Sequence, residues 1–553
     1  MKRCPACGRD YNDDSLSYCL DDGSELLFGP VSMDEPATAI LRSEAPTTVD
    51  IALASSPVTA SVSSNRKFIT VGTLAILAAV VVGVAGYWFY GRQAGEEIRS
   101  IAVLPFENKG SDPDSEYLSD GLAESLIYRL SQLPDLKVSP TSSVLRYKGA
   151  GMDPLKIGSE LGVGSVMTGR IVHRGDNLTI SVELVDVGNG KVLWGEQFDR
   201  KASELLATQR EIAKEIVENL KLKVSPQEKA LTKQYTQSND AYNFYLKGRF
   251  FWNKRTAENV KKAIEQFQQA ADKDPSFALA YVGLADCYLI LEQYGSTPSS
   301  ETLPKARAAA VRALEIDDSL AEAHTSLGMV NQQQWKPVES EKEYRRAIEL
   351  NPNYATTHHW YSILLTLIGR PDEAMAEIQR AQQIDPLSPI IALNIGNQHA
   401  LRGELEDAAK QYQKALELNP NFPSAISDLG YIFAKQGREQ EAIAYLQKAA
   451  EVTERANEEL ASLGYGYGIL GKRTEAMAVV KELEARHAKR ECPAMYVAAV
   501  YLAMRDKDQA FAWLEKDFQA RTALLPYIAL LPVFDTLRSD PRYTELMRRT
   551  GFR

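Results

Sequence analysis

The sequence predicts a multidomain chain that ends in an all-α array of helix pairs. Ahead of this array it predicts a small cysteine-bearing segment, one membrane-spanning helix and an α/β domain. Three observations support this fold class. Small residues and alanines recur every 34 residues over the second half of the chain, one run of 23 residues lacks any charge, and one expected strand alternates apolar with polar side chains. A length of 553 residues also exceeds what one compact domain usually holds.

The composition excludes several classes of protein. With 44% hydrophobic and 25% charged residues, most of the chain should fold rather than stay disordered. A formal net charge of −10 gives no overall attraction to nucleic acid, so we do not expect nucleic acid as a partner. Five cysteines are too few for a disulfide scaffold, and three of them lie in the first 19 residues.

Residues 1–28 predict a structural zinc site. The candidate ligands are Cys4, Cys7, Cys19 and Asp22. Zinc takes four tetrahedral ligands, and so short a segment needs such a staple to fold. The CPxCG knuckle and the second knuckle at 19–23 resemble the short zinc ribbons that begin many bacterial membrane proteins. Asp22 stands where the fourth cysteine would be, and Asp21 is the alternative ligand. Because the segment is acidic, we expect it to contact protein rather than DNA.

A tether and a membrane helix follow. Residues 29–66 are rich in Ser, Thr and Ala, hold scattered prolines and show no periodicity, so they predict a flexible linker. Residues 67–91 contain the uncharged run, which would be about 35 Å long as a helix and so would cross a hydrocarbon core of about 30 Å. The run is too long and too far from the N-terminus for a signal peptide, so we expect a permanent single span.

Charges at the two ends of this run predict its orientation. Two basic residues precede it, whereas the arginine behind it is followed closely by two glutamates, which places the N-terminus in the cytoplasm. The cytoplasm would also keep the zinc thiolates reduced. Ala75, Ala79 and Gly83 form a small-residue face that could pair two copies of the helix into a homodimer.

Residues 98–200 predict an α/β domain. Strands are expected over 101–106, 136–138, 165–172, 178–187 and 192–198. An amphipathic helix should start at Asp120, and a second helical patch lies around 157–161. Together these elements indicate a mixed sheet backed by helices, followed by a connecting helix within 201–240.

This α/β segment resembles a known domain family. The resemblance is carried by the phrases SIAVLPFEN, YLSDGLAESLIYRLSQLPDLKV, IGSELGVGSVMTGRI and VELVDVGNGKVLWGEQFDR. They are similar to the TolB amino-terminal-like (FlgO-like) domain, which is found outside the membrane in many bacterial anchored proteins. The resemblance implies a binding or positioning module and no catalytic residue.

Residues 241–520 predict about eight helix pairs. Small residues occupy the eighth position of each repeat: Gly248, Ala285, Gly328, Ser362, Gly396, Gly430, Gly464 and Ala498. An alanine recurs in the second helix: Ala263, Ala306, Ala374, Ala408, Ala442, Ala476 and Ala510. Four repeats close with Pro275, Pro352, Pro386 and Pro420. This 34-residue register resembles tetratricopeptide repeats, which implies a superhelix whose concave face is made by the first (A) helix of each pair. Residues 521–553 should cap the last repeat.

The concave face is the expected site for a protein or peptide ligand. Candidate contacts are polar and aromatic residues of the A helices that packing does not use: His359, Asn394, Asn397, Tyr431 and Lys435. Residues 247–255 mix bases with aromatics as single-strand nucleic-acid binders do, but their register as the first A helix explains the aromatics. No metalloprotease, phosphate-binding, hydrolase or kinase motif appears, and Cys287 and Cys492 are expected to be buried structural thiols. We therefore expect no enzyme.

These elements together predict a membrane-anchored scaffold or signalling and envelope adaptor of a bacterial inner membrane. The N-terminus would be cytoplasmic, and the α/β domain and the repeats would be periplasmic or extracytoplasmic. Two alternatives remain open. The chain could be a zinc-ribbon transmembrane regulator of transcription or signalling, or an accessory subunit of a membrane enzyme.

Overall fold

The structure, a computed structural model, divides the chain into two compact units, Met1–Ala94 and Gly95–Arg553. In the first unit it describes the backbone of three short antiparallel strands in the order β2-β1-β3: β1 (Lys2–Arg3), β2 (Asp10–Tyr11) and β3 (Leu27–Phe28). In the second unit it describes residues 98–552 apart from 110–115, 134, 150, 152, 221–232, 255, 295–296 and 298, with only the backbone at 292–294.

Several sequence predictions lie outside the described residues. They are the zinc ligands Cys4, Cys7, Cys19 and Asp22 with the alternative Asp21, the linker 29–66 and the membrane span 67–91. Among the helices that the structure does describe, none has both the length and the apolar composition needed to cross a bilayer.

A mixed sheet forms the α/β domain, as the sequence predicts. The strands are β4 (Ser100–Val103), β5 (Glu107–Asn108), β6 (Lys137–Val138), β7 (Ser165–Arg174), β8 (Asn177–Asp186) and β9 (Val192–Lys201). Their order is β6-β4-β7-β8-β9, with β5 also paired to β7. Strand β4 runs parallel to β6 and β7, whereas β7, β8 and β9 are joined by antiparallel hairpins. The apolar face of β8 is buried, because alternate side chains of a strand point to opposite faces.

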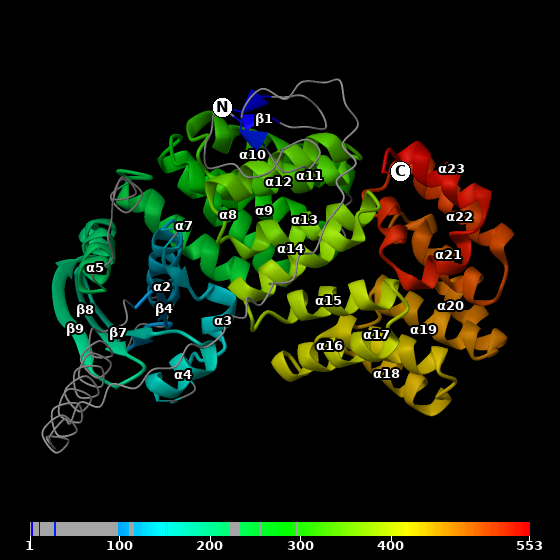
Figure 1. Cartoon of the computed structure of the whole chain (residues 1–553), viewed down its shortest axis with the longest axis horizontal. Coiled ribbons are helices and arrows are strands. Elements are labelled where there is room, and N and C mark those ends of the chain that lie inside the picture. The colour runs from blue at the N-terminus through cyan, green and yellow to red at the C-terminus, as the bar shows by residue number, and fades with distance from the viewer. Residues whose placement is uncertain are drawn as a thin grey trace, which may run out of the picture. The chain divides into compact units, whose positions relative to one another are not determined.

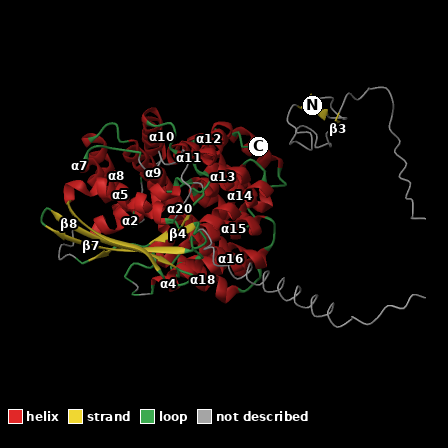
Figure 2. Ribbon diagram, turned by 60° about the vertical axis from the view of Figure 1, so that its left-hand side comes forward, coloured by secondary structure: helices red, strands yellow, loops and turns green. Residues whose placement is uncertain are grey.

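Helices α2 (Glu116–Ser131) and α5 (Leu205–Asn219) cover one face of this sheet (Figure 2). The shorter helices α3 (Thr141–Leu145) and α4 (Pro154–Leu161) lie in the connection between β6 and β7. Helix α5 falls in the region expected to hold a connecting helix, yet Ile212 and Ile216 are fully buried in the core of the domain. It is therefore a layer of the α/β domain.

Helix α2 begins one turn earlier than predicted. Asp120, which the sequence suggested as its N-terminal cap, lies inside the helix and accepts a hydrogen bond from Lys148 Nζ at 2.7 Å. The cap prediction is wrong because this carboxylate is engaged in a tertiary ion pair rather than with the helix N-terminus.

Sixteen helices follow in the described part of the chain and alternate as A and B helices (Figure 1). They are α7 (Asn239–Asn253), α8 (Ala257–Lys273), α9 (Ala278–Tyr294), α10 (Ser299–Ile316), α11 (Ala321–Gln333), α12 (Pro337–Leu350), α13 (Ala355–Leu367), α14 (Pro371–Ile384), α15 (Pro389–Leu401), α16 (Leu405–Leu418), α17 (Pro423–Lys435), α18 (Glu439–Val452), α19 (Asn457–Ile469), α20 (Arg473–Ala488), α21 (Ala494–Ala503) and α22 (Lys507–Ala520). The all-α solenoid predicted from the 34-residue register is confirmed.

The repeating residues do the packing that the register predicts. A Cβ added at Gly396 would lie 2.5 Å from the ring of Tyr412, so glycine is what lets this A helix approach its B helix. All seven recurring alanines of the B helices are fully buried. Helices α8, α12, α14 and α16 each end two residues before a predicted stop proline, because the residue before proline disfavours helix.

The last residues fold back on the array. The segment holds η3 (Leu525–Ala529), η4 (Pro532–Leu537) and α23 (Pro541–Thr550), and α23 packs on α22. Trp335 Nε1 donates to the carbonyl oxygen of Thr522 at 3.1 Å, and Gln332 Nε2 donates to Tyr527 Oη at 2.9 Å. The segment therefore contacts the third repeat as well as the last one.

Candidate functional site

A groove of about 2520 Å³ runs along the A helices of the solenoid. Its lining comes from eight successive A helices, α7, α9, α11, α13, α15, α17, α19 and α21. Side chains of α2 and α3 from the α/β domain also line it, and so do residues of η3 and η4. Successive A helices place equivalent positions side by side, which is why one face of the repeat forms one continuous surface.

Four of the five residues proposed from sequence line this groove: His359, Asn394, Asn397 and Tyr431. Lys435 is outside the lining. It is the last residue of α17 and is exposed, with Nζ 5.7 Å from the centroid of the Tyr431 ring. The structure thus brings four candidates from three neighbouring A helices onto one surface.

His359 is held as a neutral hydrogen-bond acceptor. Burial lowers the pKa of its imidazole to about 4, so the ring is uncharged near neutral pH. The amide nitrogen Nδ2 of Asn394 lies 3.1 Å from His359 Nε2, and a carboxamide nitrogen can only donate. Nε2 therefore accepts, and the ring proton is on Nδ1. The same amide donates to the carbonyl oxygen of Ile390 at 2.9 Å, which fixes its orientation.

Asn397 and Tyr431 occupy equivalent positions in adjacent repeats, 34 residues apart. Tyr412 Oη donates to Asn397 Oδ1 at 2.8 Å, which turns the amide of Asn397 in a fixed direction. The ring of Tyr431 packs against that of Tyr465, with centroids 5.8 Å apart, and both rings line the groove. This part of the surface therefore combines oriented polar groups with aromatic faces.

Sequence reasoning missed an acidic part of the groove. Asp428 on α17 and Glu458 and Glu459 on α19 all belong to the lining. Burial and the neighbouring glutamates raise the pKa of Asp428 to about 8, and burial together with Glu458 raises that of Glu459 to about 8. The repeat register could have found the first of these residues, because Asp428 lies 34 residues after Asn394.

The groove lining also includes a buried joint between the α/β domain and the first repeats. Glu124 on α2 accepts from Arg249 Nε on α7 at 2.7 Å and from Asn253 Nδ2 at 2.9 Å. One continuous hydrophobic core includes residues of the sheet, of α2 and of the first two repeats. Arg249 comes from the basic and aromatic stretch 247–255, so in the structure its charge is used inside the protein.

The joint also encloses a cavity of about 80 Å³, lined by Tyr128, Tyr245, Glu322 and others. Burial raises the pKa of Glu322 to about 7. A second link lies nearer the middle of the array, where the hydroxyls of Ser142 and Ser143 each donate to Asp385 at 2.5 Å. The α/β domain is thus fixed to the A-helix surface at more than one place.

Few other groups in the described residues have the arrangement of a metal or nucleophilic site. His399, Glu404 and Asp407 bring ligand atoms within 4.8 Å of one another, but the two acids are exposed and His399 Nδ1 already contacts Glu404 at 2.6 Å. Cys287 and Cys492 are buried, as predicted. Burial raises the pKa of Cys492 to about 12, which keeps it from acting as a thiolate.

Comparison with known protein families identifies the repeats. Models described as tetratricopeptide or TPR repeats match residues 250–321, 396–437 and 424–459. The solenoid is an array of tetratricopeptide repeats. A further model, described as the second domain of HilA/YgeH-like transcriptional regulators, matches residues 97–219, which include the sheet and α5. The resemblance of the same residues to the TolB amino-terminal-like domain stays a prediction.

Curated relatives match part of the chain. A Rhizobium meliloti protein named "Putative adenylate cyclase 3" is 30% identical over 234 residues, which are 42% of this chain and 40% of that protein. The transcriptional regulator HilA of Salmonella typhimurium is 26% identical over 239 residues, 42% of this chain and 41% of HilA. The chain thus spans about two fifths of the length of these relatives. Among solved structures, PilF of Pseudomonas aeruginosa is 25% identical, with 38% of this chain and 92% of that chain covered at a TM-score of 0.32.

Proposed function

We propose that this chain is a membrane-anchored scaffold or adaptor that holds a protein or peptide partner in the groove of its tetratricopeptide repeats. The groove itself is the observation that carries the proposal. Its volume of about 2520 Å³ is well above the roughly 300–1,000 Å³ of pockets that hold small molecules. An extended polypeptide fits such a surface better than a metabolite does.

The polar groups of the groove support a binding role. Asn394 and His359 form a hydrogen bond between two repeats, and Asn397 is oriented by Tyr412. Such pre-oriented donors and acceptors lower the entropic cost of binding a partner's backbone. Aromatic rings such as Tyr431 add contact area at little conformational cost.

The α/β domain would hold the bound partner in a defined orientation. It shares a core with the first repeats, and α2 and α3 contribute to the groove lining. The relatives named as a transcriptional regulator and as an adenylate cyclase support a signalling role for this combination of modules. We place the chain in a signalling or envelope pathway on that basis, with no catalytic step of its own.

The membrane anchor and the zinc ribbon are part of the proposal. Residues 67–91 would cross the bacterial inner membrane once, with 1–28 in the cytoplasm and the α/β domain and repeats outside it. Support comes from the uncharged run and from the basic residues ahead of it. Labelling intact cells with an impermeant thiol reagent should modify a cysteine placed at exposed Glu417 and spare one placed at Ser56 in the linker ahead of the span. Equal labelling of both positions would overturn this topology.

Zinc content tests the ribbon. The full chain should carry one zinc per copy, and Cys19→Ser should lose it. Asp22→Asn should weaken zinc retention during dialysis against a chelator, whereas Asp21→Asn should not. The opposite result would assign the fourth ligand to Asp21.

Site-specific photocrosslinking in cells tests the groove. A benzoylphenylalanine at Asn394 should form crosslinked products with a partner protein. The same residue at Glu417, an exposed position on helix α16 outside the groove lining, should not form those products. If the two positions gave the same products, or if Asn394 gave none, the groove would not be the binding site.

The HilA-type match favours a second candidate, a regulator whose output is transcription. In that case the ribbon would contact the transcription machinery in the cytoplasm. A Cys19→Ser variant would then change the transcript profile of the cell while leaving the crosslinks at Asn394 unchanged. An unaltered profile would count against this candidate.

A further inference from the structure

The acidic part of the groove carries three carboxyl groups that no ion pair between described residues neutralises. We call Asp428, Glu458 and Glu459 the acidic section. These residues interact electrostatically with one another and line the groove at the sixth and seventh repeats. We propose that the acidic section binds a lysine- or arginine-rich segment of the protein partner. This inference rests on the proposed function of the groove and assigns the chemistry of its ligand.

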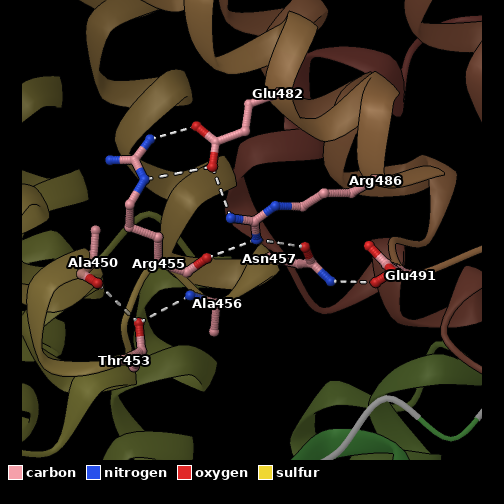
Figure 3. A network of polar contacts seen from close by, with 8 residues as sticks. All are labelled: Ala450, Thr453, Arg455, Ala456, Asn457, Glu482, Arg486 and Glu491. Carbon is pink, nitrogen blue, oxygen red and sulfur yellow. Dashed lines mark hydrogen bonds and ion pairs between the residues drawn. The ribbon is translucent and has the colours of Figure 1, made fainter. Parts of the chain in front are cut away.

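Two arginines that meet at the start of α19 are engaged elsewhere, as Figure 3 shows. Arg455 Nη2 donates to Glu482 Oε2 at 2.6 Å, and Arg486 Nη2 donates to the other oxygen of the same carboxylate at 2.7 Å. Arg486 Nη1 also donates to Asn457 Oδ1 at 3.0 Å and to the carbonyl oxygen of Arg455 at 2.7 Å. These contacts direct both cations to Glu482 and the α19 turn, next to Glu458 in sequence but without pairing it.

A buried hydroxyl beside these acids is unsatisfied. Ser427 is 5% exposed and lines the groove, and its Oγ has no hydrogen-bond partner among the described residues. Helical hydroxyls can bond to the carbonyl four residues earlier, as Thr325 and Thr366 do here. Ser427 does not, so a hydroxyl with no described partner lies in the groove lining one residue before Asp428, available to a bound cationic group.

The carboxyl groups of the acidic section favour a cationic ligand over an acidic or an apolar one. Burial and the two glutamates raise the carboxyl pKa of Asp428 to about 8, so this group is largely protonated near neutral pH. A cationic side chain favours the ionised carboxylates by pairing with them, whereas an acidic segment disfavours them further. An apolar segment would cover the carboxyls without pairing them, which is costly. The ring of Tyr465 lines the same groove, and an aromatic face also favours a cation.

Fluorescence anisotropy on the full chain in non-ionic detergent tests the proposal. The probe is a labelled 12-residue peptide of alternating lysine and serine, and the comparison is the same peptide with glutamate for lysine. The groove variant carries Asp428→Asn, Glu458→Gln and Glu459→Gln. The control variant replaces the same number of carboxyl groups at exposed B-helix positions outside the groove lining: Glu406→Gln, Glu417→Gln and Glu451→Gln.

The lysine peptide should bind the wild type, and its affinity should fall at least about tenfold in the groove variant. The control variant should change it by less than about twofold, since exposed charges contribute little. Ser427→Ala, which keeps all three acids, should weaken binding by a smaller factor and should leave the thermal unfolding profile unchanged. The proposal would be overturned if both charge variants lost affinity equally or if the wild type did not bind the lysine peptide. It would also be overturned if the glutamate peptide bound more tightly, or if millimolar Mg²⁺ or Ca²⁺ competed as strongly as unlabelled peptide.

This test is separate from that of the groove as a whole. If crosslinks at Asn394 identify a partner while the lysine peptide fails to bind, the groove remains the docking site and only the basic character of the ligand is wrong. If the peptide binds and Asn394 gives no crosslink in cells, the binding chemistry stands and the scaffold proposal fails.

Discussion

Replacing Arg249 by methionine should loosen the joint between the α/β domain and the first repeat. Arg249 and Asn253 donate to the two oxygens of Glu124, whose side chain is only 9% exposed. Methionine keeps an apolar side chain beside Trp252 but leaves the carboxylate with Asn253 alone. Removing one partner of a buried ion pair costs about 3–5 kcal/mol, and the remaining hydrogen bond favours the lower end, about 3 kcal/mol.

Hydrogen–deuterium exchange of the full chain measures this loss at the joint. A loss of about 3 kcal/mol corresponds to roughly 100-fold faster exchange of the amides in α2 and α7 that open together. The matched control is Arg346→Met on α12, whose pair with Glu349 is exposed on both sides and should change nothing measurable.

A double variant separates the cause from general damage. Adding Glu124→Gln to Arg249→Met removes the unpaired charge, so exchange should return to within about tenfold of the wild type. If Arg249→Met left the protection of α2 unchanged, or if the double variant exchanged as fast as the single one, the joint would not depend on this ion pair.

Three further outcomes follow from buried groups. Gly396→Ala should lower the free energy of unfolding, measured in urea, by about 1–2 kcal/mol despite the better helix propensity of alanine, because its Cβ would lie 2.5 Å from the ring of Tyr412. Since burial raises the pKa of Glu322 to about 7, the native state holds a proton that the unfolded chain releases, so stability should increase as the pH falls from about 7 to about 5. Glu322→Gln should remove this part of the pH dependence, measured as the difference between the two proteins. Cys287 and Cys492 should resist thiol reagents at about pH 8 until the chain is unfolded, followed by mass spectrometry of the labelled peptides.

The solenoid could be predicted because its packing is local and repeated. Each repeat has small residues where its two helices touch. Residues such as Gly396 and Ala408 recur at a fixed spacing, and this spacing predicts the contact between the helices. The start of α2 could not be predicted in the same way. The local sequence around Asp120 predicts a helix cap, but the structure pairs its carboxylate with Lys148. No local sequence pattern indicates that ion pair.

The candidate site was predicted in part for the same reason. The register identifies the concave face, so His359 and Asn394 could be assigned to it. It does not show which side chains leave the groove near the end of a helix, and Lys435, the last residue of its helix, is exposed outside the lining. Asp428 could have been found by its spacing from Asn394. The joint between Glu124 and Arg249, which are 125 positions apart, could not, because its formation depends on how two domains dock.

The return of the C-terminal segment changes the mechanics of the array. In most repeat proteins each repeat contacts only its neighbours, so distant repeats can move relative to one another. Here Gln332 and Trp335 are tied to residues 195 and 187 positions later. These two hydrogen bonds connect α11 and the turn after it to the C-terminal segment. The third repeat and the last repeats therefore cannot move apart until the contacts at Thr522 and Tyr527 break. Pulling on the C-terminus, or removing the residues from Thr522 onward, would therefore act directly on α11 in the middle of the array.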